Sequence, residues 1–221
     1  MITAWRTELL SSLDGAHLRP LDQCSHSNSW LLENHQLFPS HYVRMVHLRC
    51  GLMSTKTRKS RGGRGDENLN CRRGCAKFES LSHILQKCAR THDYRCLRHN
   101  DVCKMVHKKL RRNAVVTYYE PRIPLTTSYC KPDIIALVMD ITICDPGLIA
   151  SAWDGKVGKY NTAEVNASIQ RHLSSLGHVV DRVEHHPIVV TCNGLMFDRS
   201  FKSLKKCGFW RRDLGTSVWQ Q

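Results

Sequence analysis

The stretch KPDIIALVMDITICDP, residues 131–146, places Asp133 and Asp140 within a run of mostly aliphatic and β-branched residues. Such a run predicts a strand pair or one long buried strand. A carboxylate inside a buried strand is unfavourable unless a cation neutralises it. Asp133 and Asp140 therefore indicate a divalent-cation site. Magnesium suits it because it takes one or two carboxylates together with water and phosphate oxygens.

The segment WDGKVGKY, residues 153–160, follows and contributes Lys156. A lysine beside a metal site can orient water or offset charge on a phosphorane-like transition state. Two aspartates and a lysine around Mg²⁺ form a minimal set for phosphodiester hydrolysis. The Ile141 carbonyl is a possible further ligand.

Other interpretations of these acids stay open. Asp133 also fits a turn residue after proline, and Asp140 fits a solubility charge on an edge strand. Asp145 is interpreted as a strand-ending turn residue, and Glu120 as a second candidate acid.

Upstream, CRRGCAKFESLSHILQKC, residues 71–88, holds Cys71, Cys75, His83 and Cys88. Three thiolates and one imidazole form a closed tetrahedral zinc set, which is typical of a structural site. Gly74 allows a tight turn between the first two ligands, and residues 80–88 have a helical pattern. His92 and Cys96 lie close enough in sequence to replace a ligand, and coincidental spacing is the alternative.

The remaining pattern predicts an α/β fold. Helical segments are expected before residue 55 and at 99–112, and one amphipathic helix at 157–177, with Gly177 at its C-cap. Strands are expected at 115–119 and 186–192, and a last short helix at 200–210. We divide the chain into a helical linker and basic loop (1–68), a knuckle with a basic helix (69–112) and a small mixed-sheet domain (113–221).

Composition indicates the type of partner. The 221 residues carry a net charge of +14, which favours a polyanion such as nucleic acid. The basic loop is expected to grip phosphates in a salt-dependent manner, with a solvated linker as the alternative; its cations are Lys56, Arg58, Lys59, Arg61 and Arg64. The lack of long apolar runs predicts a soluble protein with no membrane partner and no signal peptide. The 11 cysteines are expected to be thiols, mostly small buried hydrophobes.

Several motifs occur together in one order: the cysteine–histidine knuckle, RCLRHN, EPRI, KPDII and KVGKY. In this combination the chain resembles the C-terminal region of the Pol polyprotein of type-1 non-LTR retrotransposable elements that insert in ribosomal RNA genes. NSWLLENHQL and HLRCGLM resemble the linker after the reverse transcriptase. The resemblance implies a CCHC zinc knuckle and a restriction-like endonuclease of the PD-(D/E)XK type. It also implies a nick in target DNA that primes reverse transcription, with element RNA as a second partner and the nucleus as location.

The resemblance also assigns roles. Asp133 matches the aspartate of the PD motif and Asp140 the second metal-binding acid. Lys156 matches a catalytic lysine displaced onto the following helix, and Tyr160 a tyrosine near the same site. Arg98 and His99 match an Arg-His motif that contacts substrate or braces the site. The four knuckle residues match the family's zinc ligands.

Two departures limit these expectations. Only six residues separate Asp133 from Asp140. On a single strand they would lie on opposite faces unless the chain bends between Ile134 and Val138. This spacing predicts a degenerate nuclease, and hence a nucleic-acid-binding module with an inactive nuclease fold as the rival function.

The second departure is the absence of any Asp-Asp pair from the sequence. The polymerase part of the parent polyprotein, an RNA-directed DNA polymerase, is therefore expected to be missing, as in a truncated copy or separate fragment. A generic basic zinc-binding scaffold is the third candidate.

Overall fold

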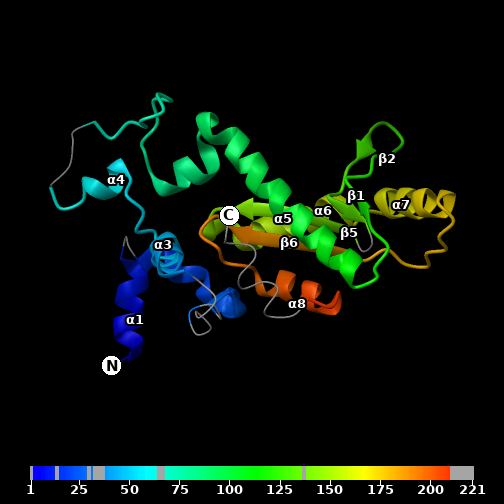
Figure 1. The fold of residues 1–221 in the computed structure, drawn as a ribbon, viewed down its shortest axis with the longest axis horizontal. Helices are drawn as coiled ribbons and strands as arrows, with labels where there is room; N and C mark the ends of the chain where they lie inside the picture. Colours follow the sequence, from blue (N-terminus) through cyan, green and yellow to red (C-terminus); the bar gives the residue numbers. More distant parts are fainter. Residues whose placement is uncertain are drawn as a thin grey trace.

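The computed structural model describes residues 2–12, 15–28, 31, 38–63, 68–135 and 138–209. In Figure 1 the N-terminal helices and the knuckle lie at one end, and a sheet with its covering helices at the other. The α-helices are α1 (Ile2–Ser11), α3 (Pro39–Arg49), α4 (Lys56–Lys59), α5 (His92–Arg112), α6 (Ile149–Tyr160), α7 (Ala163–Ser175) and α8 (Asp198–Lys206). Short 3₁₀ helices are η1 (Gly15–Gln23), η2 (Ser25–Asn28), η5 (Ala89–Thr91) and η6 (Pro146–Leu148), and η4 (His83–Lys87) is a π-helix.

The strands form two sheets. The larger sheet has the order β1-β4-β5-β6, from Tyr118–Tyr119, Ile134–Ile135, Val138–Cys144 and His185–Thr191. Its β5–β6 pair is parallel and its other pairs are antiparallel. A small antiparallel pair joins β2 (Ile123–Pro124) to β3 (Tyr129–Cys130). The predicted mixed sheet is confirmed, although the strand expected at 115–119 is only two residues long.

A hairpin replaces the single strand on which the two aspartates were expected to face apart. β4 ends at Ile135 and β5 begins at Val138, and Ile134 lies opposite Met139 in antiparallel register. Extending this register by one residue places Asp133 across from Asp140, and residues directly opposite in such a pair share a face. The spacing argument for a degenerate nuclease is therefore wrong, because the chain reverses between the two carboxylates.

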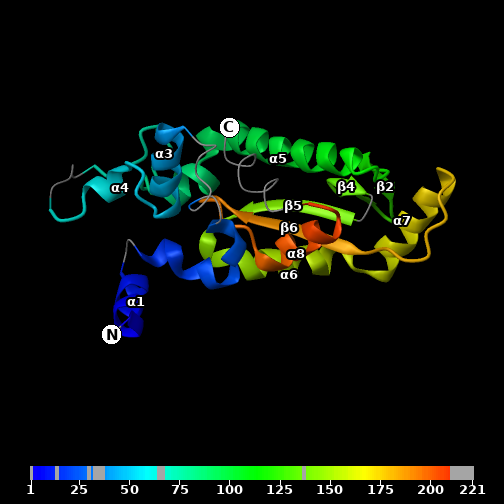
Figure 2. The same ribbon diagram turned by 60° about the horizontal axis from the view of Figure 1, so that its bottom comes forward.

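Alternating residues of β5 face two different helix layers, shown in Figure 2 with α5 on one side of the sheet and α6 on the other. Met139 and Ile141 pack with Val106 and Leu110 of α5. Val138 packs with Tyr160 at the end of α6 and with residues of α7. The two aspartates of the hairpin therefore lie between α5 and α6, two helices that are far apart in the sequence.

Helix α8 covers the open edge of β6. The Ser200 hydroxyl accepts a hydrogen bond from the Val189 N–H (2.9 Å) and donates one to the Pro187 carbonyl (3.0 Å). These bonds satisfy backbone groups that an uncovered edge strand would expose to pairing with another chain.

The single helix expected at 157–177 is two helices in the structure. α6 ends at Tyr160, and α7 begins after Thr162, whose hydroxyl accepts a hydrogen bond from the Val165 N–H as an N-cap. Gly177 does follow the C-terminus of α7 with φ +83°, as predicted. The break turns α7 away from α6, so Lys156 lies within the last turns of α6 rather than at the start of a long helix.

Arg49 joins the N-terminal helices to the sheet domain. Its buried guanidinium donates to the carbonyls of Asn193 (3.0 Å) and Gly194 (2.6 Å), in the turn after β6. It also donates to the Asn28 side chain (2.6 Å). Residues 29–30 and 32–37 of the expected linker lie outside the described residues.

Candidate metal centre and candidate nuclease site

A short hairpin brings the first two candidate zinc ligands together. Asn70 and Phe78 form a β-bridge, and the Cys71 N–H donates to the Lys77 carbonyl (2.7 Å). Between them Gly74 adopts φ +74°, a left-handed conformation that side chains disfavour. The tight turn between Cys71 and Cys75 is as the sequence predicted.

The other two ligands are His83, the first residue of η4, and Cys88, its C-cap, and the π geometry explains why both can face one point. In a regular α-helix residues five apart differ by about 140° around the axis. Here the Cys88 N–H donates to the His83 carbonyl (2.7 Å), an i→i+5 bond that widens the turn. In this wider turn, residues five apart lie on the same side, so His83 and Cys88 face one point. In a regular α-helix they would not.

The ligand atoms of Cys71, Cys75, His83 and Cys88 lie within 4.8 Å of one another. The Cys75–Cys88 and Cys71–Cys88 sulfur separations are 3.7 and 4.0 Å, and His83 Nε2 lies 3.0 Å from Cys75 Sγ. Zn–S bonds of about 2.3 Å in a tetrahedron place sulfur atoms about 3.8 Å apart. The Arg73 N–H also points at Cys71 Sγ (3.4 Å), which suits a thiolate. The residues present therefore fit a structural zinc ion.

The alternative ligands do not join this group. His92 and Cys96 lie on an exposed turn of α5, where their side chains are 3.5 Å apart. Among the described residues of the knuckle, the ligand atoms that converge are those of the expected four-residue set.

Buried Glu79 connects the knuckle to the basic segment. Its carboxylate accepts from the Lys56 and Arg72 backbone N–H groups (3.1 and 3.0 Å) and pairs with the Arg72 guanidinium. The hydrogen bond from Arg72 lowers the Glu79 pKa to about 2. The expected loop at 56–68 therefore begins with a one-turn helix, α4, whose Thr55 N-cap accepts from the Arg58 N–H.

The predicted phosphate-gripping residues cluster on this segment. Lys56, Arg58 and Lys59 lie on α4, and Arg61 follows it, whereas Arg64 lies outside the described residues. Both ribbon views place α4 beyond the knuckle, away from the sheet. Any contact they make with phosphates lies far from the two aspartates.

At the hairpin, each aspartate is held by a different helix layer. Asp140 forms an ion pair with Lys156 of α6, and the Tyr160 hydroxyl donates to Asp140 Oδ1 (3.5 Å). Asp133 Oδ2 accepts from the Ile141 N–H (2.6 Å) and lies 3.5 Å from His99 Nε2 of α5. The structure thus brings together all four predicted catalytic residues: Asp133 just before β4, Asp140 in β5, and Lys156 and Tyr160 in α6.

The pKa values of the two carboxyl groups are shifted in opposite directions. Burial raises the pKa of Asp140, the contact with Lys156 offsets part of this rise, and the negative charge of Asp133 adds to it. Burial also acts to raise the pKa of Asp133, but hydrogen bonds from His99 and Ile141 outweigh it and the pKa is lowered. The cationic groups beside the two carboxylates are Lys156, which pairs with buried Asp140, and His99, which contacts half-buried Asp133.

The Arg-His pair divides between two sites. His99 Nε2 contacts the Ile141 carbonyl (3.0 Å) as well as Asp133, so that carbonyl already has a partner. Arg98 points the other way and donates to the Leu85 carbonyl of the knuckle (3.0 Å). His99 thus braces the aspartate hairpin, whereas Arg98 braces the knuckle.

Glu120 and Asp145, the other two acids considered from the sequence, each form an ion pair with a lysine. Glu120 pairs with Lys131, and its N–H donates to the Asp133 carbonyl (2.8 Å). Asp145 lies at the end of β5, as expected, and pairs with Lys87 of the knuckle (3.4 Å). Neither belongs to a candidate metal group within the described residues.

Sequence reasoning missed Cys103. This buried thiol forms a second candidate metal group with His99 and Asp133. A helical offset of four residues between His99 and Cys103 is the signal that could have revealed the contact. The described cysteines are free thiols, and those buried outside the knuckle are Cys24, Cys103, Cys130, Cys144, Cys192 and Cys207.

Known proteins with similar sequences are Pol polyproteins of retrotransposable elements. A Pol polyprotein from the type-2 retrotransposable element R2DM of Drosophila melanogaster is 28% identical over 208 residues, 90% of this chain and 19% of that protein. One from the type-1 element R2 of Nasonia vitripennis is 29% identical over 209 residues, covering 92% and 20%. The homologues of this chain are R2 Pol polyproteins. The expected resemblance is confirmed.

A further R2 Pol relative, from Popillia japonica, is 30% identical over 163 residues, 69% of this chain and 26% of that protein. The chain spans about a fifth of the length of the first two R2 relatives. No protein-family model matches. Among the described residues, none of the helices is long and apolar enough to cross a membrane.

Proposed function

We propose that this chain is the zinc-knuckle and endonuclease region of an R2 Pol polyprotein, with a restriction-like fold of the PD-(D/E)XK type. It hydrolyses one strand of target DNA in the nucleus, and the nick primes reverse transcription of element RNA. The polymerase belongs to a part of the polyprotein outside this chain.

The paired aspartates beside Lys156 are the observation that carries this proposal. Asp133 and Asp140 lie opposite each other at the end of a hairpin, and Lys156 reaches Asp140 from a helix on the face of the sheet opposite α5. A surface solubility charge would not be buried, whereas Asp140 is 6% exposed. Burying this cluster is costly, and such a cost is typical of a functional site.

Each residue has a role that follows from its contacts. Asp133 and Asp140 would hold Mg²⁺, which when bound activates water and neutralises charge on the scissile phosphate. Lys156 can move from Asp140 toward the phosphate and stabilise the transition state. Tyr160 orients Asp140 through its hydroxyl, and His99 keeps Asp133 in place.

Nicking of supercoiled plasmid by the zinc-loaded chain, with Mg²⁺ or Mn²⁺, tests this assignment. Asp140→Asn should abolish nicking without loss of zinc. Lys156→Gln should lower the rate about a hundredfold or more, because one electrostatic stabiliser of a transition state is worth that much. Lys159→Gln, on the same helix, should change it less than about threefold.

The rival function is a binding module with an inactive nuclease fold. It is favoured by one observation: Asp133 Oδ2 is already engaged by the Ile141 N–H and by His99. Zinc-loaded protein that binds plasmid but never nicks it, with either metal, would establish the rival.

A further inference from the structure

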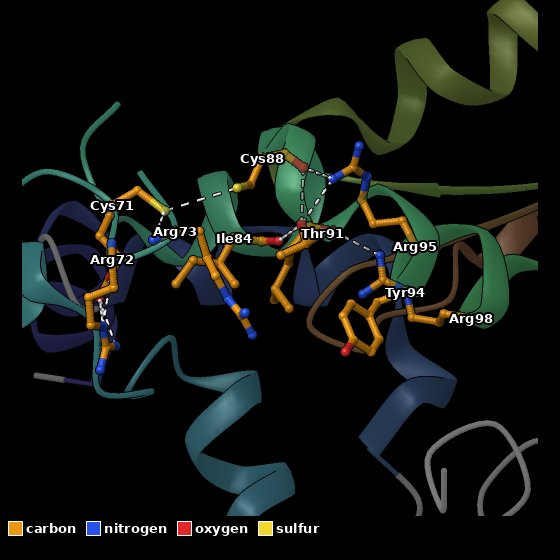
Figure 3. A pocket seen from close by; sticks show the side chains of 11 residues that line it. Cys71, Arg72, Arg73, Ile84, Cys88, Thr91, Tyr94, Arg95 and Arg98 are labelled. Atoms are coloured by element: carbon orange, nitrogen blue, oxygen red, sulfur yellow. Dashed lines mark hydrogen bonds and ion pairs between the residues drawn. The ribbon is translucent and has the colours of Figure 1, made fainter. Parts of the chain in front are cut away.

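A cavity of about 640 Å³ lies between the knuckle and the first turns of α5, away from the aspartate hairpin. Figure 3 shows Arg73 entering it from the knuckle and Tyr94, Arg95 and Arg98 from α5. Ile84 adds apolar lining. The volume lies in the range of small-ligand pockets, about 300–1,000 Å³.

The lining holds four arginines against one carboxylate, Glu79, and it also includes the candidate zinc ligands Cys71 and Cys88. Arg72 is paired with Glu79. Arg95 donates to the Thr91 hydroxyl (3.0 Å), and Arg98 to the Leu85 carbonyl. No carboxylate of the described residues forms an ion pair with Arg73, Arg95 or Arg98. We call these three the cavity arginines.

Arg98 indicates that an anion belongs here. Its Nε is shielded from solvent and has no hydrogen-bond partner in the described chain. Burial lowers the Arg98 pKa, and the nearby Arg95 charge lowers it further. Arg95 and Arg98 lie one turn apart on α5 and have no carboxylate partner among the described residues, which favours a phosphate as their counter-ion.

Tyr94 supplies the second element of recognition. Its side chain is 67% exposed although it lies beside a cavity with an apolar wall. An exposed aromatic ring next to guanidinium groups is the arrangement on which an unpaired base stacks.

We propose that this cavity binds one unpaired nucleotide of a single strand, with its base on Tyr94 and its phosphate on the cavity arginines. This deepens the proposed function, since it rests on nucleic acid being the ligand. A duplex keeps its bases stacked inside and cannot place one in a concave site without flipping it. The knuckle therefore selects single-stranded over double-stranded segments.

Fluorescence anisotropy tests the site on the whole zinc-loaded chain, without Mg²⁺ so that nothing is cleaved. The probes are labelled oligothymidylate, labelled oligouridylate and a DNA duplex of equal length. Tyr94→Ala should weaken single-strand binding at least fivefold, since stacking on one aromatic ring is worth that much or more. Tyr94→Phe keeps the ring and should stay within about twofold of the unmodified protein.

Charge is tested with a matched pair. Arg73→Gln should weaken single-strand binding, whereas Arg90→Gln, an exposed arginine of the same segment outside the lining, should have little effect. The two single-strand probes decide whether DNA or RNA is preferred. Zinc content of every variant, measured by metal analysis, excludes a folding defect.

Three results would overturn the proposal: no effect of Tyr94→Ala, an equal loss on duplex, or an equal loss in Tyr94→Phe. Its failure is distinct from failure of the nuclease. If the protein nicks plasmid and Tyr94→Ala leaves its single-strand binding unchanged, only the proposed nucleotide site is wrong. If the protein binds single strands through Tyr94 and never nicks plasmid, only the proposed endonuclease activity is wrong.

Discussion

His99 is the residue whose charge state decides how Asp133 is held. The hydrogen bond with Asp133, helped by Cys103, raises the His99 pKa from 6.5 to about 11. The imidazolium is therefore a cation at neutral pH and anchors the carboxylate. Without it, Asp133 would lose one of the hydrogen bonds that hold its carboxylate beside the Ile141 N–H.

This raised pKa predicts a defined pH dependence. Its contribution to stability is present in full below about pH 6.5, declines as pH rises, and is lost once pH passes about 11. In zinc-loaded, Mg²⁺-free protein, NMR of the ring nitrogens should show His99 doubly protonated from pH 7 to 9. Asp133→Asn should return the His99 pKa toward 6.5. A neutral His99 at pH 8 in the unmodified protein would contradict the ion pair.

At the scale of elements, the knuckle and α4 form one unit through Glu79. One buried carboxylate satisfies two backbone N–H groups and one guanidinium from two segments. Its lowered pKa means that this stabilisation is present above about pH 4.5 and is lost as pH falls toward about 2.

Glu79→Gln should release α4 from the knuckle at neutral pH. The glutamine amide is uncharged, so it cannot form an ion pair with Arg72, and it has one acceptor oxygen where the carboxylate has two. Limited trypsin digestion should cut after Lys56, Arg58 or Lys59 several-fold faster than in the unmodified protein. Asp181→Asn, in an exposed loop, serves as control. Unchanged cleavage at α4 would show that Glu79 does not hold it.

The other elements show which patterns transfer from sequence to structure. The break between α6 and α7 carries a signal, the N-cap Thr162, which the apolar periodicity across 157–177 masks. The β4–β5 reversal is harder to foresee, because continuous apolar runs fit one strand as well as two. Only the pairing with β6 on one side and β4 on the other decides between them.

For the whole molecule, α5 is the connection between the knuckle and the hairpin. Arg98 contacts the Leu85 carbonyl at one end, and the next residue, His99, contacts Asp133. Asp145 and Lys87 add a second contact between sheet and knuckle. The knuckle has little apolar core of its own, and a zinc ion bound by its four candidate ligands would supply the missing stability.

Zinc removal by a chelator should therefore loosen one part of the protein and leave the other. Structural zinc contributes on the order of 10 kcal/mol to such a site. Hydrogen exchange followed by mass spectrometry should rise across 68–98 and remain slow in β5 and β6. Loss of protection in β5 and β6 as well would show that the sheet cannot fold without the metal.

Local spacing in the sequence determined the candidate zinc ligand set, because all four residues fall within residues 71–88 and a turn and a helix suffice to gather them. It also identified both aspartates and Lys156, since buried carboxylates and a nearby lysine are unusual in an apolar run. The relation between these groups depended on tertiary structure. Strand pairing placed Asp133 beside Asp140, and helix packing sent His99 and Arg98 to different sites. The apolar run around the two aspartates fits one strand as well as two, and His99 and Asp133 lie 34 positions apart, so no local pattern encodes these contacts.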